Sequence, residues 1–250
     1  FFSTKFEKPN HHRDAVIGST KNYNMHSSSN EEYYIEQYWT LISSGFKDFE
    51  KKIQIYDLGC GQGRFSFKFA EYFKSANIVG CDFSKFAIDY ANNFSINNNL
   101  SSRVTFINES IADFSQKQNK NSADLIILTE VVFYYPDWQN DLDIILSLLK
   151  PNGKIILSVR SQYFNALNLV KHKNFDKLDL VINRRQGQLF DGPGKFTWQT
   201  SEEIKNLLIK KNLLLDNIFA IGSLSGIEGD PHEYVCEPSK LSQNEQKKLM

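Results

Sequence analysis

The sequence has no excess of charge of either sign and no long apolar run. Lys plus Arg and Asp plus Glu both number 29 among 250 residues, so no overall field draws the chain to nucleic acid or to an anionic membrane surface. The longest apolar runs, such as 125–129 and 155–159, are too short to cross a bilayer. No basic stretch followed by an apolar one begins the chain, so we expect neither a signal peptide nor a membrane anchor. The equal numbers of positive and negative charges favour a small-molecule partner and give no indication of oligomeric state.

Cysteine and histidine are also scarce. The three cysteines, Cys60, Cys81 and Cys236, are an odd number, and two of them lie in apolar, strand-like runs where a buried thiol is ordinary. A reducing, cytoplasmic setting is therefore expected. Neither His11 nor His12 has a carboxylate or cysteine at metal-ligand spacing, so no metal site is expected. Because the chain begins without Met, we expect an excised part of a longer polypeptide.

Short apolar runs alternate with longer amphipathic stretches from residue 53 onward, which is typical of βα units on a parallel sheet. Strands are expected at 53–58, 77–82, 103–107, 124–129 and 153–160, with a sixth at 213–221. Helices are expected at about 64–74, 84–94, 111–116 and 138–149. Two capping boxes predict further helices, one beginning after Ser29 with Glu32 and one running from Thr200 with Glu203 to about residue 211.

This alternation predicts a division of the chain into four segments. They are an N-terminal arm and cap helix at 1–50, an α/β core at 51–160, an insertion at 161–199, and a helix, strand and tail of the same domain at 200–250. The insertion contains a turn at 191–194 and follows the fifth strand. It is expected beside the carboxyl ends of the strands, where open α/β sheets bind ligands, and so is a candidate substrate lid.

A glycine-rich turn follows the first strand directly. The stretch Asp57-Leu58-Gly59-Cys60-Gly61-Gln62-Gly63 places glycines at alternate positions, where the backbone bends sharply and approaches a ligand closely. Asp57 can accept hydrogen bonds from a cationic or amide group held at the turn. The alternative is a strand-to-helix turn without a ligand, but the next strand also ends in a carboxylate, Asp82, of the kind that accepts hydrogen bonds from ribose hydroxyls.

Residues 57–63 resemble the first motif of class I S-adenosylmethionine-dependent methyltransferases, and Val79-Gly80-Cys81-Asp82-Phe83-Ser84 resembles their second. The resemblance extends from about residue 53 to 221. It implies a doubly wound, mostly parallel, Rossmann-like α/β sheet of about seven strands with helices on both faces, and S-adenosylmethionine as the cofactor. It also implies that Gly59, Cys60, Gly61 and Gly63 line the methionyl part, that Asp82 binds the ribose and that Phe83 lies against the adenine.

The third motif region differs from the family pattern. Ser110 stands where the family often has an Asp that holds the adenine amino group. By the resemblance, Ser110 or the neighbouring Glu109 takes that role, and the backbone amide of Ile111 pairs with a ring nitrogen.

The fourth region, residues 124–136, resembles the end of the fourth strand in small-molecule methyltransferases of the nodulation N-methyl and ubiquinone-biosynthesis O-methyl types. By this resemblance Thr129 and Glu130 face the sulfonium and the acceptor. Glu130 is a candidate general base or acceptor-orienting group, or else a carboxylate that only positions backbone. Phe133, Tyr134 and Tyr135 form either an aromatic wall near the sulfonium or core packing. We take Glu130 and Tyr134 as the candidate catalytic residues.

Three alternatives remain at the level of function. The prediction is methyl transfer to an oxygen or nitrogen of a small-molecule acceptor. A catalytically inactive, cofactor-binding regulatory or scaffold module is the main alternative, and a nicotinamide-dependent dehydrogenase is disfavoured by the glycine spacing. No N-P-P-Y-like or Pro-Cys motif supports DNA methylation. Arg160 is left open between binding a substrate carboxylate or phosphate and solvated charge, whereas Arg184 and Arg185 are expected to be solvated surface charge.

Overall fold

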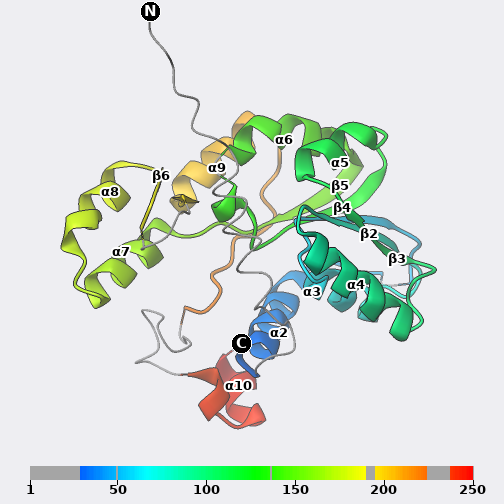
Figure 1. Ribbon diagram of the computed structural model, residues 1–250, viewed down its shortest axis with the longest axis horizontal. Helices are drawn as coiled ribbons and strands as arrows, with labels where there is room; N and C mark the ends of the chain where they lie inside the picture. Colours follow the sequence, from blue (N-terminus) through cyan, green and yellow to red (C-terminus); the bar gives the residue numbers. More distant parts are fainter. Residues whose placement is uncertain (1–28, 49, 136, 190–194, 224–236, 250) are drawn as a thin grey trace, which may run out of the picture.

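A five-stranded parallel sheet forms the centre of the protein (Figure 1). The structure is a computed structural model that describes residues 29–48, 50–135, 137–189, 195–223 and 237–249. The strands lie in the order β3-β2-β1-β4-β5. Their bounds are Gln54–Leu58 (β1), Asn77–Asp82 (β2), Val104–Asn108 (β3), Ala123–Leu128 (β4) and Leu149–Leu157 (β5). The first five predicted strands are thereby confirmed, with small shifts at their ends.

Strand β1 lies in the middle of the sheet and marks the point where the chain changes direction. From β1 the chain runs outward through β2 to β3 and then crosses to the other side of β1 as β4. Asp57 of β1 is in register with Gly80 of β2 and with Ile127 of β4. The carboxyl ends of β1, β2 and β4 therefore meet at the switch point, which is where open α/β sheets bind ligands.

Helices cover both faces of the sheet, as predicted. One face carries α2 (Ser29–Ser43), α3 (Arg64–Tyr72) and α4 (Lys85–Asn97), and the other carries α5 (Ile111–Lys117), α6 (Trp138–Ser147) and α9 (Ser201–Lys210). Since successive side chains of a strand point to opposite faces, Leu125 and Ile127 pack under the first layer and Ile126 and Leu128 under the second. The predicted Thr200–Glu203 capping box at the start of α9 is present.

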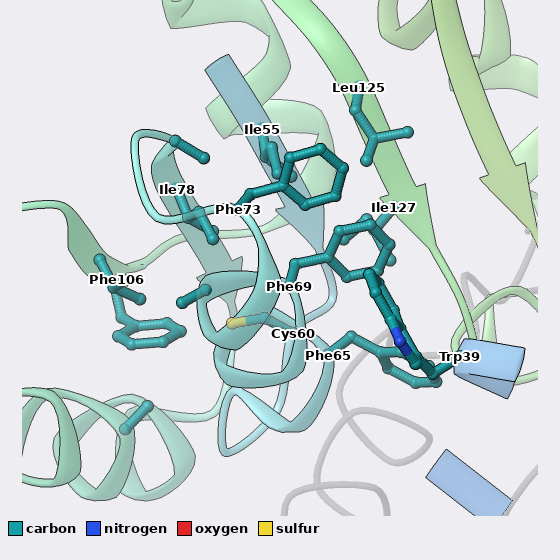
Figure 2. Packing of buried hydrophobic residues seen from close by; sticks show 14 of the residues in the cluster. Trp39, Ile55, Cys60, Phe65, Phe69, Phe73, Ile78, Phe106, Leu125 and Ile127 are labelled. Carbon is teal, nitrogen blue, oxygen red and sulfur yellow. The ribbon is translucent and has the colours of Figure 1, made fainter. Parts of the chain in front are cut away.

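Aromatic side chains fasten α2 to α3 on the first face. The Trp39 ring stacks on Tyr72 at a centroid distance of 4.0 Å and meets Phe69 edge-on at 5.3 Å. Figure 2 shows Trp39 with Phe65, Phe69 and Phe73 against the strand residues of this face. Ion pairs from Glu31 to Arg64 and from Glu36 to Lys68 also join the two helices. Both aromatic packing and ion pairs thus hold α2, the predicted cap helix, against α3.

The described part of 161–199, the predicted insertion, has a small core of its own. It contains α7 (Gln162–Lys171), η2 (Phe175–Lys177), α8 (Leu178–Asn183) and the hairpin of β6 (Gln186–Gly187) with β7 (Phe196–Thr197). Leu169, Val181, Leu189 and Trp198 are buried together, and the Trp198 indole N–H donates to the carbonyl of Val181 at 3.0 Å. In Figure 1 these elements lie to one side of the sheet. The predicted turn at 191–194 lies outside the described residues.

The predicted sixth strand at 213–221 is wrong. These residues form irregular backbone, and Leu214 is 95% exposed. The Lys154–Asp216 ion pair holds the segment near β5, but no ladder joins the two. An apolar run becomes a strand only when a neighbour pairs with its backbone, and composition does not supply that neighbour. The described residues therefore contain a five-stranded sheet and one short hairpin instead of a sheet of about seven strands.

The remaining elements are short. They are η1 (Val132–Tyr134), η3 (Pro238–Lys240) and α10 (Gln243–Leu249). None of the helices in the described ranges combines the length and apolar composition that crossing a membrane requires.

Candidate active site

The glycine loop between β1 and α3 adopts the left-handed backbone that its glycines permit. Gly59 and Gly61 have φ angles of 74° and 53°. A side chain on Gly59 would lie 2.4 Å from Cγ2 of Val131, so the loop presses directly on the end of β4. A Cβ on Gly61 would meet nothing within 4 Å. The loop is therefore packed at Gly59 and open at Gly61, where a ligand can approach the backbone.

Asp57 anchors this loop to the start of α3. Its carboxylate oxygen Oδ2 accepts hydrogen bonds from the backbone N–H of Ser66 at 3.0 Å and from the Ser66 hydroxyl at 2.6 Å. Asp57 is only 2% exposed, and burial raises its pKa to about 6 although the Ser66 hydrogen bonds act in the opposite direction. It also lines a small recess with Gly59, Gly61 and Thr129. Asp57 thus both supports the loop and borders the site.

Asp82 lies at the end of β2, facing the loop. Its Oδ2 accepts from the backbone N–H of Gly61 at 3.0 Å, and its Oδ1 accepts from that of Ser84 at 2.8 Å. Burial raises the pKa of this carboxyl, and both hydrogen bonds oppose the shift. Because a carboxylate offers about four lone-pair positions, the two oxygens retain acceptor capacity toward the cleft that Asp82 and Phe83 line.

The third motif region places its residues at the start of α5. Ser110 is the N-cap, where its hydroxyl accepts from the backbone N–H of Asp113 at 3.1 Å and donates to the carboxylate of Asp113 at 2.6 Å. Glu109 forms an ion pair with Lys117 at 2.6 Å. Ser110 and Ile111 line the cleft, and the first N–H groups of a helix have no partner within it. Of the two side chains considered for the adenine, Ser110 is the one that borders the cleft.

Two residues predicted to bind the cofactor, Cys60 and Gly63, direct their side chain or Cβ position toward the core. The Cys60 thiol is buried in the first core layer, and Figure 2 shows its sulfur on the side of Phe106. A Cβ on Gly63 would lie 2.7 Å from Phe106 Cζ and 2.8 Å from Phe67 Cε2. The D-x-G-x-G-x-G spacing identified the loop correctly, but it cannot tell which positions face a ligand and which face the core.

Thr129 and Glu130 follow β4 at the opposite side of the switch point. Thr129 is buried, and its hydroxyl oxygen has no hydrogen-bond partner among the described residues. Glu130 has a φ of 56°, an uncommon backbone conformation for a residue other than glycine. Such outliers cluster at functional sites because the surrounding structure must hold them.

Three side chains from separate elements converge on the Glu130 carboxylate. Tyr38 of α2 donates to Oε1 through its hydroxyl, and Ser158, just after β5, approaches the same oxygen at 3.4 Å. The Ser158 hydroxyl also accepts from the Glu130 backbone N–H at 2.7 Å. Arg160 Nη2 lies 3.8 Å from Glu130 Oε2. Burial and then the neighbouring Glu130 raise the pKa of Tyr38 well above its usual range, so Tyr38 remains a donor.

Sequence reasoning missed Tyr38 and Ser158. Tyr38 belongs to the apolar stripe of α2 and reads as a core residue, which its ring is. Nothing in the local sequence indicates that its hydroxyl reaches a residue 92 positions away.

Three aromatic side chains, Phe133, Tyr134 and Phe196, form a contiguous group near the Glu130 cluster. The Phe133 ring is buried, and its centroid lies 4.3 Å from that of the Tyr134 ring. The Tyr134 centroid lies 5.5 Å from that of Phe196. Burial raises the pKa of Tyr134. Phe133 therefore packs in the core and lines the cleft at once, while Tyr134 is partly exposed at its wall.

A cleft of about 2260 Å³ joins these groups and continues along the outer edge of β5 to residues 213–223. It exceeds the usual few hundred to about 1,000 Å³ of a small-molecule pocket, because it combines an inner site with this outer trough. The glycine loop, Asp82, Glu130, Tyr134 and Arg160 all line this cleft. No cluster of metal-binding side chains occurs in the part of the chain that the structure describes.

A family model described as a methyltransferase domain matches residues 49–214. The chain belongs to this methyltransferase family. The match confirms the resemblance drawn from the glycine loop and Asp82. It also supports S-adenosylmethionine as the cofactor, in agreement with the glycine spacing that disfavoured a nicotinamide-dependent dehydrogenase.

Individual relatives of this methyltransferase are distant. The ubiquinone biosynthesis O-methyltransferase of Coxiella burnetii (strain RSA 493 / Nine Mile phase I) is 30% identical over 134 residues, covering 53% of this chain and 50% of the relative. The chain thus spans about half the length of the curated relatives it matches.

Solved structures share the fold. A protein of Pyrococcus horikoshii OT3 superposes with a TM-score of 0.57 at 20% identity, covering 77% of this chain and 88% of that one. An S-adenosylmethionine-dependent methyltransferase of Aquifex aeolicus gives 0.55 at 12% identity, covering 82% and 93%.

The residues at the switch point fit S-adenosylmethionine. Gly61 leaves open space where any other residue would project a side chain, Asp82 keeps free lone pairs, and Thr129 offers a buried hydroxyl that has no partner among the described residues. Asp57 and Asp82 are carboxylates, the appropriate charge beside a cationic cofactor.

Proposed function

We propose that this protein transfers the methyl group of S-adenosylmethionine to an oxygen or nitrogen of a small-molecule acceptor. The single observation that carries the proposal is that the glycine loop, Asp82 and the Tyr38-supported Glu130 line one and the same cleft. The printed name of the Coxiella relative, a ubiquinone biosynthesis O-methyltransferase, supports an oxygen acceptor.

On the cofactor side we assign binding to the residues that border the cleft or its recess. Asp57, Gly59 and Gly61, with Cys60 through its backbone, would hold the methionyl part, and Gly63 would act only through the packing of the loop. Asp82 would accept from the ribose hydroxyls. The adenine would contact Phe83, Ser110 and Ile111. The sulfonium would lie beside Thr129. When bound, the cofactor supplies a methyl group on a positively charged sulfur that is a good leaving group.

On the acceptor side we assign Glu130 the role of receiving the proton of the nucleophile. Its carboxylate is held by Tyr38 and Ser158, so its position is set before an acceptor arrives. Holding the nucleophile in line with the methyl group supplies much of the rate in such a reaction, and the base adds to it. Tyr134 would bound the acceptor and face the sulfonium with its ring. The segment 161–199, through α7 and Phe196, would close over the acceptor and exclude water.

The first experiment is calorimetry of the purified chain with S-adenosylmethionine and S-adenosylhomocysteine, with NADH as a control. We expect binding of the first pair alone. Release of S-adenosylhomocysteine is then measured with a panel of small amines, hydroxy acids and sugars. Cofactor binding without turnover of any panel member would favour the inactive binding module.

Glu130→Gln tests the catalytic assignment. It keeps the shape of the side chain but removes the base, and we expect turnover to fall by roughly 10²- to 10⁴-fold with cofactor affinity unchanged. Glu71→Gln, at an exposed ion pair on α3, is the matched control and should leave both unchanged. Full turnover by Glu130→Gln would show that Glu130 is not the base.

A further inference from the structure

Arg160 lies at the junction between β5 and the insertion, one residue before the N-cap of α7. Its guanidinium carbon lies 4.4 Å from the ring centroid of Phe133 and 4.9 Å from that of Phe164. A planar cation between two aromatic rings is held by attraction to both faces and keeps its N–H edge free to point elsewhere. The position of this charge is therefore set by the fold before any ligand binds.

The guanidinium donors of Arg160 have no acceptor among the described residues. The nearest carboxylate oxygen, Oε2 of Glu130, lies 3.8 Å from Nη2, which is too long for a hydrogen bond. Among the described residues the Arg160 guanidinium donates no hydrogen bond, whereas that of Arg103 donates to the carbonyls of Phe73 and Ala70. The Arg160 side chain is 35% exposed and lines the cleft. The side chain thus borders the space that an acceptor would enter.

Glu130 does not satisfy this edge, because its nearest oxygen, Oε2, lies 3.8 Å from Nη2 and its other oxygen, Oε1, accepts from Tyr38 and Ser158. A guanidinium fork pairs best with a planar, two-oxygen anion. A carboxylate meets this requirement and adds one negative charge beside Arg160, whereas a phosphate would bring up to two charges close to the Glu130 carboxylate. The charge balance therefore favours a carboxylate.

We propose that Arg160 binds a carboxylate of the acceptor, and that the acceptors are hydroxy acids or amino acids whose nucleophilic oxygen or nitrogen lies beside Glu130. This inference rests on the proposed methyl transfer and names its substrate class. The two protein groups lie 3.8 Å apart at their nearest atoms, so a carboxylate and a nucleophile separated by a few bonds reach both.

The test uses four probe pairs, each an acid and its carboxamide: glycolate and glycolamide, lactate and lactamide, glycine and glycinamide, and salicylate and salicylamide. Their binding to the complex of the full chain with S-adenosylhomocysteine is measured by ligand-observed NMR titration. The variants are Arg160→Gln and Arg160→Lys. Arg185→Gln is the control, since Arg185 pairs with Glu203 at an exposed site outside the cleft. Unchanged S-adenosylhomocysteine affinity in each variant shows that it is folded.

We expect at least one acid to bind roughly tenfold or more tightly than its carboxamide. Arg160→Gln should weaken that acid by roughly tenfold to a hundredfold and leave the amide unchanged. Arg160→Lys should restore part of the difference in affinity between the acid and its carboxamide, since lysine keeps the positive charge but lacks the two-pronged guanidinium. A merely structural role for Arg160 would weaken both members of a pair alike.

Two results would overturn the inference. One is an acid-to-amide ratio in Arg160→Gln equal to that of the wild type. The other is the absence of binding by all four acids in the millimolar range while S-adenosylhomocysteine binds. If S-adenosylhomocysteine itself does not bind, the proposed function fails first, and the inference falls with it for that separate reason.

Discussion

Gly61 and Gly63 are two residues apart in the same loop, and substitutions at them should separate binding from stability. Both have positive φ angles, 53° and 85°. A Cβ at Gly61 meets nothing within 4 Å, whereas one at Gly63 would lie 2.7 Å from Phe106 and 2.8 Å from Phe67. The first position faces the cleft and the second faces the aromatic core.

The expected magnitudes follow from these surroundings. A left-handed backbone costs a non-glycine residue about 1–2 kcal/mol, which lowers Tm by roughly 2–8 °C in a chain of this size. Gly61→Ala should show that loss alone. Gly63→Ala adds an overpacking cost of about 1–3 kcal/mol, for a total of about 2–5 kcal/mol and a Tm loss of roughly 4–20 °C. Gly61→Val carries more strain than Gly61→Ala and, in addition, places its side chain where the cofactor is proposed to lie.

Calorimetry with S-adenosylmethionine and thermal unfolding on the same samples provide the measurement. Gly61→Val should remain folded and lose cofactor binding. Gly63→Ala should unfold at a lower temperature yet retain, in its folded fraction, an affinity close to that of the wild type. Wild-type affinity in Gly61→Val would refute the placement of the cofactor at this loop, and a Gly63→Ala that binds worst while unfolding normally would reverse the assignment of the two faces.

Two further predictions concern Asp57 and Tyr38. A folded-state pKa of about 6 against 3.8 for a free Asp means that burial favours the protonated form, so the contribution of Asp57 to stability is full below pH 3.8 and is lost as pH rises through about 6. The difference of about 2.2 pH units at 1.36 kcal/mol each is about 3 kcal/mol, and urea unfolding from pH 4 to pH 7 should show wild-type stability falling by most of that amount relative to Asp57→Asn. If the difference in unfolding free energy between the wild type and Asp57→Asn did not change with pH, Asp57 would not be the cause of the pH dependence. Tyr38→Phe should reduce kcat, because Glu130 loses its donor, and should leave cofactor affinity unchanged. In the double variant with Glu130→Gln the loss should equal that of Glu130→Gln alone, and additive losses would mean that Tyr38 does not act through Glu130.

The regular part of the fold was predictable because its residues alternate with the periods that strands and helices impose. Ile55 and Tyr56 lie on opposite faces of β1, and each belongs to the core layer that its position requires. The run at 213–221 has similar composition but is not paired to β5, and composition carries no information about pairing. Likewise, the two helices of the insertion are stabilised by the buried Trp198, whose contacts are not local.

The candidate site likewise has a part that the sequence predicts and a part that depends on tertiary packing. Asp57 and Asp82 lie near the carboxyl ends of two consecutive parallel strands and Gly61 follows the first of them; such strand ends meet, so sequence spacing alone brings these residues together. The support of Glu130 comes instead from a helix and a strand end that are distant in sequence. Their convergence is a result of packing, which no local pattern encodes.

This division explains why the cofactor is easier to assign than the acceptor. The cofactor side lies within residues 49–214, the segment that the family model matches, whereas Tyr38 lies on α2 outside it. The stacking of Trp39 on Tyr72 fixes α2 against α3, and it is this packing that brings the neighbouring Tyr38 hydroxyl to Glu130. The left-handed backbone at Glu130 in turn is held by the Ser158 hydroxyl that accepts from its N–H. If Glu130 takes the proposed role, acceptor recognition depends on how α2 and the segment at 161–199 dock on the sheet, and changes in those contacts would alter the substrate without disturbing the cofactor loop.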